Sequence, residues 1–380
     1  MTPSGEVVIL AAGRLPQGRY GGSLAGLGAA ALGRTAVEGL LRDPALPRPG
    51  SLIWGMARSH TQGMNPARTL ALGAGLPADT PAFTLNMACG SSLQALILAV
   101  QRLEGGAGAP ILAGGSEAMS DTPHLVPGLR WGFRMGHRAL PDVMHQDGLR
   151  CPVTGLLMGE TIERLAVKRG VTRPEADAWA AESHRRAAVA DFQAELLEHP
   201  GLGRDECIRP GVTAEALAGL PPVFSPEGQV TAGNASALSD GAAALLLARR
   251  DQAGGIRPLA RILGWSEAGV DPLDMGEAPV PAVRRLLAAH GLSVADIDLW
   301  ELNEAFSAQL LACQHQLGLP EDRLNAAGGG VALGHPIGAT GARIVVTLIH
   351  QLRARGGGLG VATLGIGGGL GLALLLEVPA

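Results

Sequence analysis

Short apolar runs alternate with segments of helical periodicity at both ends of the chain, and this alternation most constrains the fold. In the first third, residues 6–12 and 51–54 have the character of buried strands, and residues 24–42 carry apolar side chains at helical spacing. The last third repeats the rhythm, with a strand expected at 258–265 and a helix at 280–290. Strands that alternate with helices in this way favour a layered α/β fold.

The same patterns predict the other elements of these two parts. The expected strands are 82–85, 109–114 and 298–302, with a strand and turn at 325–330 and a terminal hairpin of 359–364 and 370–377. The expected helices are 65–76, which has Pro66 in its first turn, 93–103, 303–317 and 339–353.

The middle of the chain changes character and suggests an insertion. Residues 121–149 lack periodicity and are expected to form an irregular loop, while 158–169 and 173–198 resemble solvent-facing helices. With 380 residues the chain exceeds one ordinary core. We therefore expect three parts: an N-terminal half of residues 1–117 plus about 246–259, an inserted subdomain of 118–245, and a C-terminal half of 260–380.

The composition excludes several classes of function. Hydrophobic residues make up 47% of the chain and charged residues 17%, as in compact globular proteins. The net charge of −4 and the scattered arginines give no reason to expect a nucleic-acid partner. Lys168 is the only lysine, which excludes a Schiff-base lysine elsewhere. No apolar stretch reaches the roughly 18 residues that a membrane span needs, so no membrane partner is expected.

The four cysteines are widely spaced, which argues against a metal site. Cys89, Cys151, Cys207 and Cys313 form no CxxC pair, so no zinc or other metal centre is expected. No secretory signal pattern opens the chain, and free thiols in a reducing cytoplasm are the default expectation.

Cys89 occupies the turn between an expected strand and an expected helix. The amides and the dipole at a helix N-terminus favour a thiolate there, and Gly90 allows a ligand to approach closely. The alternative for an isolated cysteine is a buried structural residue, since free cysteines are among the most buried residues. The rest of the chain has to decide between the two.

Three further stretches are unusually polar or glycine-rich for their surroundings. Asn303 and Glu304 stand where a strand meets a helix, and Asn303 could simply cap that helix. His335 precedes a proline, which holds it in an extended conformation. The glycines around it have no side chains and so leave room for a substrate beside the imidazole. Residues 365–369 offer backbone N–H groups that could bind an anion.

Together these blocks resemble the thiolase family, which makes or cleaves 3-ketoacyl-CoA. The resemblance extends from Val7 to Glu377 and also includes residues 62–68 and 230–236. It implies a duplicated fold, with two βαβαβ-type halves in α/β/α/β/α layers and an inserted loop subdomain that covers coenzyme A. It also implies a homodimer or homotetramer with paired strands across the interface, a place in fatty acid metabolism, and no cofactor besides the CoA thioester substrate.

The resemblance assigns a role to each block. Cys89 would take the acyl group from acyl-CoA as a thioester, and His335 would accept the thiol proton. One oxyanion hole would consist of His335 and a water held by Asn303, and the other of the amides of Cys89 and Gly367. The substrate-binding and CoA-binding residues would be Ser236, Met158, Ala235 and Phe306, the first two lining the pantetheine tunnel.

Gly365 departs from the family pattern. Family members carry a second cysteine at this position, which exchanges a proton with the α-carbon of the second acyl-CoA. General acid–base catalysis is typically worth about 10²–10⁴-fold, and glycine cannot supply it. A milder departure is Leu157, where some members carry a histidine that contacts pantetheine.

Several interpretations of Gly365 follow. In the first, the chain makes or cleaves acetoacetyl-CoA or 3-ketoacyl-CoA with another base, such as Glu304 or a water held by His335. In the second, it is an acyltransferase or thioesterase without carbon–carbon bond chemistry. In the others, it is a non-catalytic CoA-binding relative, or an ordinary thiolase into which the glycine was introduced.

Overall fold

The computed structural model describes residues 5–380 of the chain. The described strands form one continuous sheet in the order β4-β3-β5-β6-β1-β7-β10-β9-β8, and the short β2 pairs with β6. The strands are β1 (Val7–Arg14), β2 (Gly18–Arg19), β3 (Ser51–Gly55), β4 (Ala82–Leu85), β5 (Ile111–Ala118), β6 (Ser239–Arg249), β7 (Ala260–Gly269), β8 (Leu299–Leu302), β9 (Gly358–Ile366) and β10 (Leu370–Val378). The α-helices are α1 (Ala29–Leu40), α2 (Pro66–Gly73), α3 (Ser91–Glu104), α4 (Met158–Arg169), α5 (Arg173–Val189), α6 (Ala214–Ala218), α7 (Pro279–His290), α8 (Ser307–Leu317), α9 (Gly330–Leu333) and α10 (Thr340–Ala354).

The two halves of the sheet repeat one arrangement of strands. In the order β3-β5-β6-β1, the first pair is parallel and the next two pairs are antiparallel. The order β8-β9-β10-β7 has the same pairing directions. A short antiparallel contact of Val8 with Arg261 and of Ile9 with Ala260 joins the halves through β1 and β7. The expected duplicated α/β architecture is confirmed.

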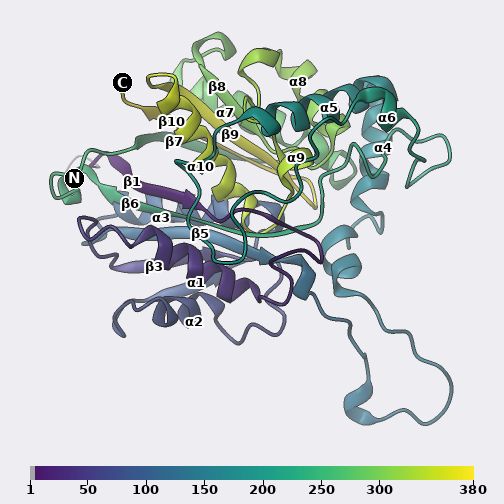
Figure 1. The fold of residues 1–380 in the computed structure, drawn as a ribbon, viewed down its shortest axis with the longest axis horizontal. Helices are drawn as coiled ribbons and strands as arrows, with labels where there is room; N and C mark the ends of the chain where they lie inside the picture. The colour runs from purple at the N-terminus through teal and green to yellow at the C-terminus, as the bar shows by residue number, and fades with distance from the viewer. Residues whose placement is uncertain (1–4) are drawn as a thin grey trace.

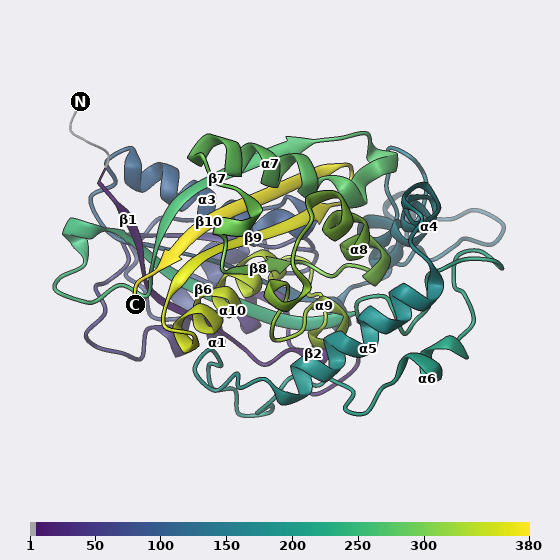
Figure 2. The same cartoon turned by 90° about the horizontal axis from the view of Figure 1, so that it is seen from above.

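Helices α3 and α10 lie between the two halves, and the other long helices cover the outer faces (Figure 1). The alternation along β1 shows this directly, because successive side chains of a strand point to opposite faces. Val7 and Ile9 pack into the cluster that contains α3 and α10, while Val8 and Leu10 pack against α1 and α2. On the far side, α7 and α8 cover the second half (Figure 2). These are the expected α/β/α/β/α layers.

The inserted segment runs between β5 and β6, where the second half has only the tight turn from β9 to β10. Helices α4 and α5 of this segment pack on the outer layer of the second half. The limit expected at residue 245 falls inside β6, which begins at Ser239. The polar pair Ser239 and Asp240 concealed this start, because Asp240 is buried and accepts a hydrogen bond from the Ser120 amide at 2.9 Å.

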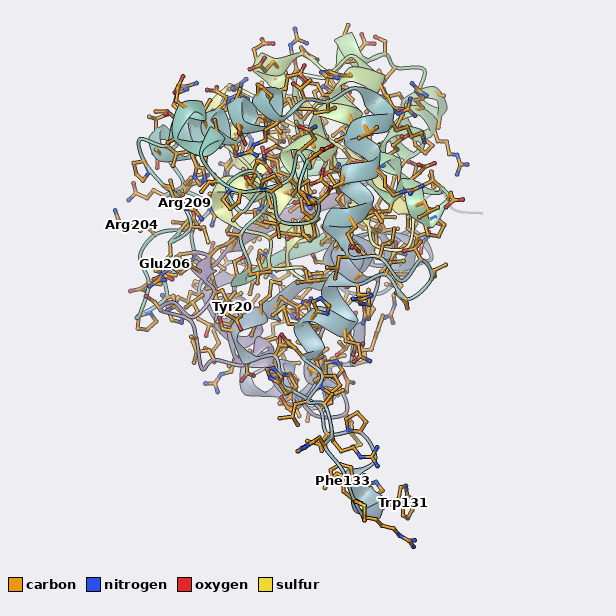
Figure 3. All side chains as sticks on the ribbon, turned by 90° about the vertical axis from the view of Figure 1, so that its right-hand side faces the viewer. Tyr20, Trp131, Phe133, Arg204, Glu206 and Arg209 are labelled. Atoms are coloured by element: carbon orange, nitrogen blue, oxygen red, sulfur yellow. The ribbon has the colours of Figure 1, made fainter. Side chains whose placement is uncertain are left out.

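A long arm projects from the body of the molecule between β5 and α4. It contains no α-helix, as expected for residues 121–149, and Figure 3 shows Trp131 and Phe133 at its tip. Trp131 is 88% exposed and Met135 is 90% exposed. The arm therefore presents large apolar side chains that the rest of the described chain does not cover.

Several element predictions differ from the structure. The helix expected at 24–42 begins only at Ala29, the one expected at 173–198 ends at Val189, and the one expected at 303–317 begins only at Ser307. Of the strand and turn expected at 325–330, the strand is wrong and the turn is present. Asn325 has a φ of 47° and its side chain bonds to both the amide and the carbonyl of Leu302, so the chain turns there instead of pairing. None of the helices in residues 5–380 is long and apolar enough to cross a membrane.

Candidate active site

Cys89 lies in a strained turn between β4 and α3. The turn is the 3₁₀ segment Ala88–Gly90, and Ala88 has a φ of 46°, which residues with a side chain seldom adopt. Asn86 holds this conformation, since its side-chain oxygen accepts a hydrogen bond from the Ala88 amide at 2.8 Å. The turn thus presents Cys89 immediately before the first turn of α3.

Contact between the first turns of α3 and α10 brings His335 to Cys89. The Ala342 amide donates to the Ser92 hydroxyl at 2.9 Å, and Gly341 lies so close to α3 that a Cβ there would be 2.4 Å from the Leu93 nitrogen. This contact sets His335 Nε2 at 3.4 Å from Cys89 Sγ. The two residues come from equivalent loops of the two halves, each just before a central helix.

Thr340 determines which nitrogen of His335 faces the thiol. The Thr340 hydroxyl donates to the Pro336 carbonyl at 3.0 Å and lies 2.6 Å from His335 Nδ1. Because its single proton is used, the hydroxyl accepts a hydrogen bond from Nδ1–H. The lone pair of Nε2 then faces Cys89, as a base requires.

Both members of the pair are neutral at rest. Burial lowers the pKa of His335 to about 3, and the charges of Arg343 and Arg58 act in the same direction. Burial also raises the pKa of the Cys89 thiol, although the Gly367 amide and the Arg58 charge oppose that rise. The pKa of the Cys89 thiol is therefore raised, not lowered as expected, because burial outweighs the opposing amides and the Arg58 charge.

Asn303 is buried with both side-chain polar atoms unsatisfied. It is 1% exposed, and neither Oδ1 nor Nδ2 has a hydrogen-bond partner within residues 5–380. Helix α8 begins only at Ser307, so Asn303 does not cap it, and the alternative of a structural cap is wrong. A buried amide without partners is costly unless a ligand or an ordered water meets it.

The residues expected to bind substrate also come together. Ala235 pairs with Phe306 in an isolated bridge, and the Ser236 amide donates to the Ala305 carbonyl at 3.0 Å. Met158 lies at the β9–β10 turn, where its Sδ would be 3.4 Å from a Cβ on Gly367.

Comparison with known proteins agrees with this geometry. The family models of the thiolase N-terminal domain and the thiolase C-terminal domain match residues 7–251 and 256–378. The chain belongs to the thiolase family. The match covers both sheet halves and the inserted segment.

The similar thiolases span the whole chain. An acetyl-CoA acetyltransferase of Pseudomonas aeruginosa is 47% identical over 98% of this chain and 99% of its own length. One of Chromobacterium violaceum is 44% identical over 98% of this chain and all of its own. The crystal structure of the Bacillus anthracis acetyl-CoA acetyltransferase has a TM-score of 0.96 at 40% identity, and that of human mitochondrial 3-ketoacyl-CoA thiolase with CoA has 0.95 at 38%. Both superpositions cover 100% of each chain.

Gly365, the position where the sequence departs from the expected pattern, lies in β9 opposite Gly371. A Cβ on Gly365 would lie 3.2 Å from the Met275 carbonyl oxygen and 3.4 Å from Pro279 Cδ. Cys313 contacts the segment that contains Met275 and Pro279, where its thiol donates to the Gly276 carbonyl at 3.1 Å. Cys313 is fully buried, and burial raises its pKa to about 12, so it cannot serve as a base.

Glu304 is occupied by a structural role. Its carboxylate accepts hydrogen bonds from four groups and is fully buried. The donors are the Trp179 indole, the Ser183 hydroxyl, the Asn325 amide and the Val331 backbone N–H. These bonds tie the inserted segment to the loop before α9. The suggestion that Glu304 replaces the missing base therefore lacks structural support.

Sequence reasoning missed two residues of this thiolase site, Arg58 and Thr340. Arg58 is 5% exposed, and its three guanidinium nitrogens have no hydrogen-bond partner within the described chain. Its nearest acid is Glu117, at 4.0 Å. Nothing in the sequence distinguishes Arg58 from other loop arginines. Thr340 follows His335 by five residues, and that spacing was the only available signal.

Proposed function

We propose that this thiolase is an acyl-CoA acyltransferase that carries the acyl group as a thioester on Cys89. The observation that carries the proposal is the 3.4 Å approach of His335 Nε2 to Cys89 Sγ, with Nε2 in the acceptor tautomer. His335 takes the thiol proton as sulfur attacks the acyl carbonyl, so charge separates only when substrate is present. A neutral resting pair protects the thiol from other electrophiles.

Two sets of donors stabilise the oxyanions of this reaction. The amides of Gly367 and Cys89 face the sulfur, since both lower the pKa of the Cys89 thiol. They are placed to bind the oxygen of the acyl group attached there. Asn303, with its unsatisfied amide, holds a water that completes a second oxyanion hole with His335.

The inserted segment covers coenzyme A. The pantetheine tunnel that leads to Cys89 is lined by Met158, Ala235, Ser236 and Phe306. The arginines Arg164, Arg204 and Arg209 of this segment form no ion pair or side-chain hydrogen bond within residues 5–380, which leaves them available for the CoA phosphates. Figure 3 shows Arg204 and Arg209 on one outer face. The reaction uses no metal and no cofactor besides the thioester substrate.

The protein assembles as a homodimer or homotetramer in the cytoplasm. Strand β4 is one of the two edge strands of the sheet, the other being β8, and it leads directly into the Cys89 turn. An unpaired edge is a template for another strand, so pairing of two β4 strands would protect both edges. The exposed arm offers a second apolar surface for a dimer of dimers.

Incubation with acetyl-CoA followed by intact-mass measurement tests the acyl-enzyme. We expect one acetyl adduct, located on Cys89 by peptide mapping and absent in Cys89→Ala. An unmodified wild-type protein would contradict the proposal and favour a non-catalytic CoA-binding role. Release of free acetate from the adduct, without acetoacetyl-CoA, would identify the thioesterase alternative that Gly365 leaves open.

A further inference from the structure

The missing thiol leaves a gap at the place where the second substrate reacts. This step rests on the proposed function and on the family resemblance, in which the side chain at 365 acts on the α-carbon of that substrate. Gly365 is half-buried, and the nearest atoms to a Cβ would be the Met275 carbonyl oxygen and the Pro279 ring. Glycine therefore offers the α-carbon of the second acyl group no titratable side chain at this position.

The buried groups that could remove an α-proton are engaged otherwise. Glu117 accepts hydrogen bonds from the backbone amides of Ala57, Arg58 and Gly338. Glu304 accepts from four donors, as described above, and Glu301 pairs with Arg343 at 3.3 Å. Within residues 5–380, the acids near the two catalytic loops are thus tied to structural partners.

His335 is a poor substitute for the missing base. Its Nδ1 is held by Thr340, and its Nε2 faces Cys89. Burial lowers its pKa to about 3, whereas an α-proton of a thioester needs a strong base. Carbanion formation by proton removal consequently has no suitable group in this site.

We propose that the second substrate is an acyl-CoA that carries a carboxylate on its α-carbon, and that loss of carbon dioxide generates the nucleophile. The bond between the α-carbon and the carboxylate breaks, and its electron pair forms the thioester enolate. The enolate attacks the carbonyl of the Cys89 thioester, and the Cys89 thiolate leaves. The products are a 3-ketoacyl-CoA and carbon dioxide. During acylation His335 passes the thiol proton to the sulfur of the departing CoA, so the Cys89 thiolate released by condensation takes up a proton from solvent.

The surroundings of Gly365 suit this step. A carboxylate beside Gly365 would first meet the Met275 carbonyl oxygen and the Pro279 ring, neither of which donates a hydrogen bond. Contact with a carbonyl oxygen and an apolar ring disfavours the charged carboxylate far more than neutral carbon dioxide. The enolate oxygen that forms has a donor instead, the water on Asn303.

The test compares two nucleophiles on the same acetylated enzyme. Cys89 is first acetylated with acetyl-CoA, and either malonyl-CoA labelled with ¹³C in its free carboxylate or further acetyl-CoA is then added. We expect acetoacetyl-CoA and labelled carbon dioxide in equal amounts from malonyl-CoA, at a rate about 10²-fold or more above that with acetyl-CoA. Cys89→Ala should form neither product.

Gly365→Cys provides the matched variant, because the gap accommodates a Cβ. Restoring the thiol should raise condensation with acetyl-CoA and reduce the advantage of malonyl-CoA. An acetyl adduct on Cys89 together with no consumption of malonyl-CoA would overturn this inference and leave the proposed function standing. Equal rates with both nucleophiles would also overturn it, and a failure to acetylate Cys89 would overturn both.

Discussion

At the scale of single residues, the site depends on charges that are absent at rest. Cys89 and His335 face each other as a neutral thiol and a neutral imidazole. Burial disfavours both the thiolate of Cys89 and the imidazolium of His335. Two features bias this pair toward proton transfer. Thr340 selects the tautomer, and the Arg58 guanidinium favours the thiolate.

Replacing Arg58 should make Cys89 less reactive. In Arg58→Leu the thiolate loses a nearby cation, so the pKa of the thiol rises and alkylation by iodoacetamide at pH 7 slows roughly three- to tenfold. The pH profile of alkylation should move to higher pH. Arg58→Lys, which retains the charge, serves as the control. A profile that is identical in the leucine variant and the wild type would rule out this electrostatic role.

Replacing Thr340 should disturb the tautomer without removing the base. Thr340→Val keeps the shape of the side chain but cannot accept the hydrogen bond from His335 Nδ1–H. Acetylation of Cys89 should slow by about 10-fold or more, a part of the roughly 10²–10⁴-fold that acid–base catalysis supplies. Thr340→Ser should recover most of the rate. Equal rates for the valine and serine variants would count against the role in tautomer selection.

At the scale of elements, the two central helices position the chemistry. The first turns of α3 and α10 touch through Gly341 and Ser92, and the loops just before these turns carry Cys89 and His335. The turn between β9 and β10 adds the Gly367 amide at the same point. A displacement of one helix relative to the other would therefore separate nucleophile from base.

A methyl group at Gly341 tests this arrangement. Gly341→Ala would place a Cβ 2.4 Å from the Leu93 nitrogen, so α10 must move away from α3. Overpacking of this kind typically costs about 1–3 kcal/mol, measurable by urea unfolding. Acetylation of Cys89 should fall in the folded variant as well. Gly108→Ala, whose Cβ meets no atom within 4 Å, is the matched control and should change neither quantity.

At the scale of the whole molecule, the fold divides its tasks. The duplicated sheet halves provide the frame, and the segment inserted in the first half carries the arm and two helices that pack on the second half. The arm buries little of itself against the body, as Figure 3 shows. Its exposed aromatic side chains are the reason for the proposed contact with another copy of the chain.

Charges at the tip of the arm should reduce the assembly. Trp131→Asp combined with Phe133→Asp places two carboxylates where apolar side chains would meet a partner. Light scattering after size exclusion should show a smaller assembly for the variant than for the wild type. Val189→Asp, at a 75% exposed position away from the arm, should keep the wild-type mass. An unchanged mass in the double variant would contradict a role of the arm in assembly.

The stability of the fold should fall on acidification in part through His184. Burial lowers the pKa of His184 to about 4, with a further contribution from Arg209, whereas in the unfolded chain it is near 6.5. The folded state keeps His184 neutral, so this stability is complete above pH 6.5 and is lost as the pH falls toward 4. His184→Asn retains an acceptor for the Arg209 amide. Urea unfolding from pH 7 to 4.5 should show a smaller loss for the variant, and an equal loss would refute the assignment.

Much of the architecture could be predicted because local patterns specify it. Helix α4 matches its predicted bounds, and α7, α10 and the terminal hairpin agree within a residue or two. The errors occur where tertiary contacts override the pattern. The polar start of β6 is one case, and Asn325, whose side chain completes the edge of β8, is another.

The sequence by itself determined the family, the layered fold and the order of the catalytic blocks, because strand and helix periodicity and the residues around Cys89, Asn303 and His335 are local features. Only the tertiary structure decided the distances between these residues, their charges and their hydrogen-bond partners. It brought Cys89 and His335 to 3.4 Å and made both neutral. It also showed Asn303 unsatisfied and Glu304 saturated. Burial and hydrogen-bond partners arise from segments far apart in the chain, so no local pattern could have revealed them.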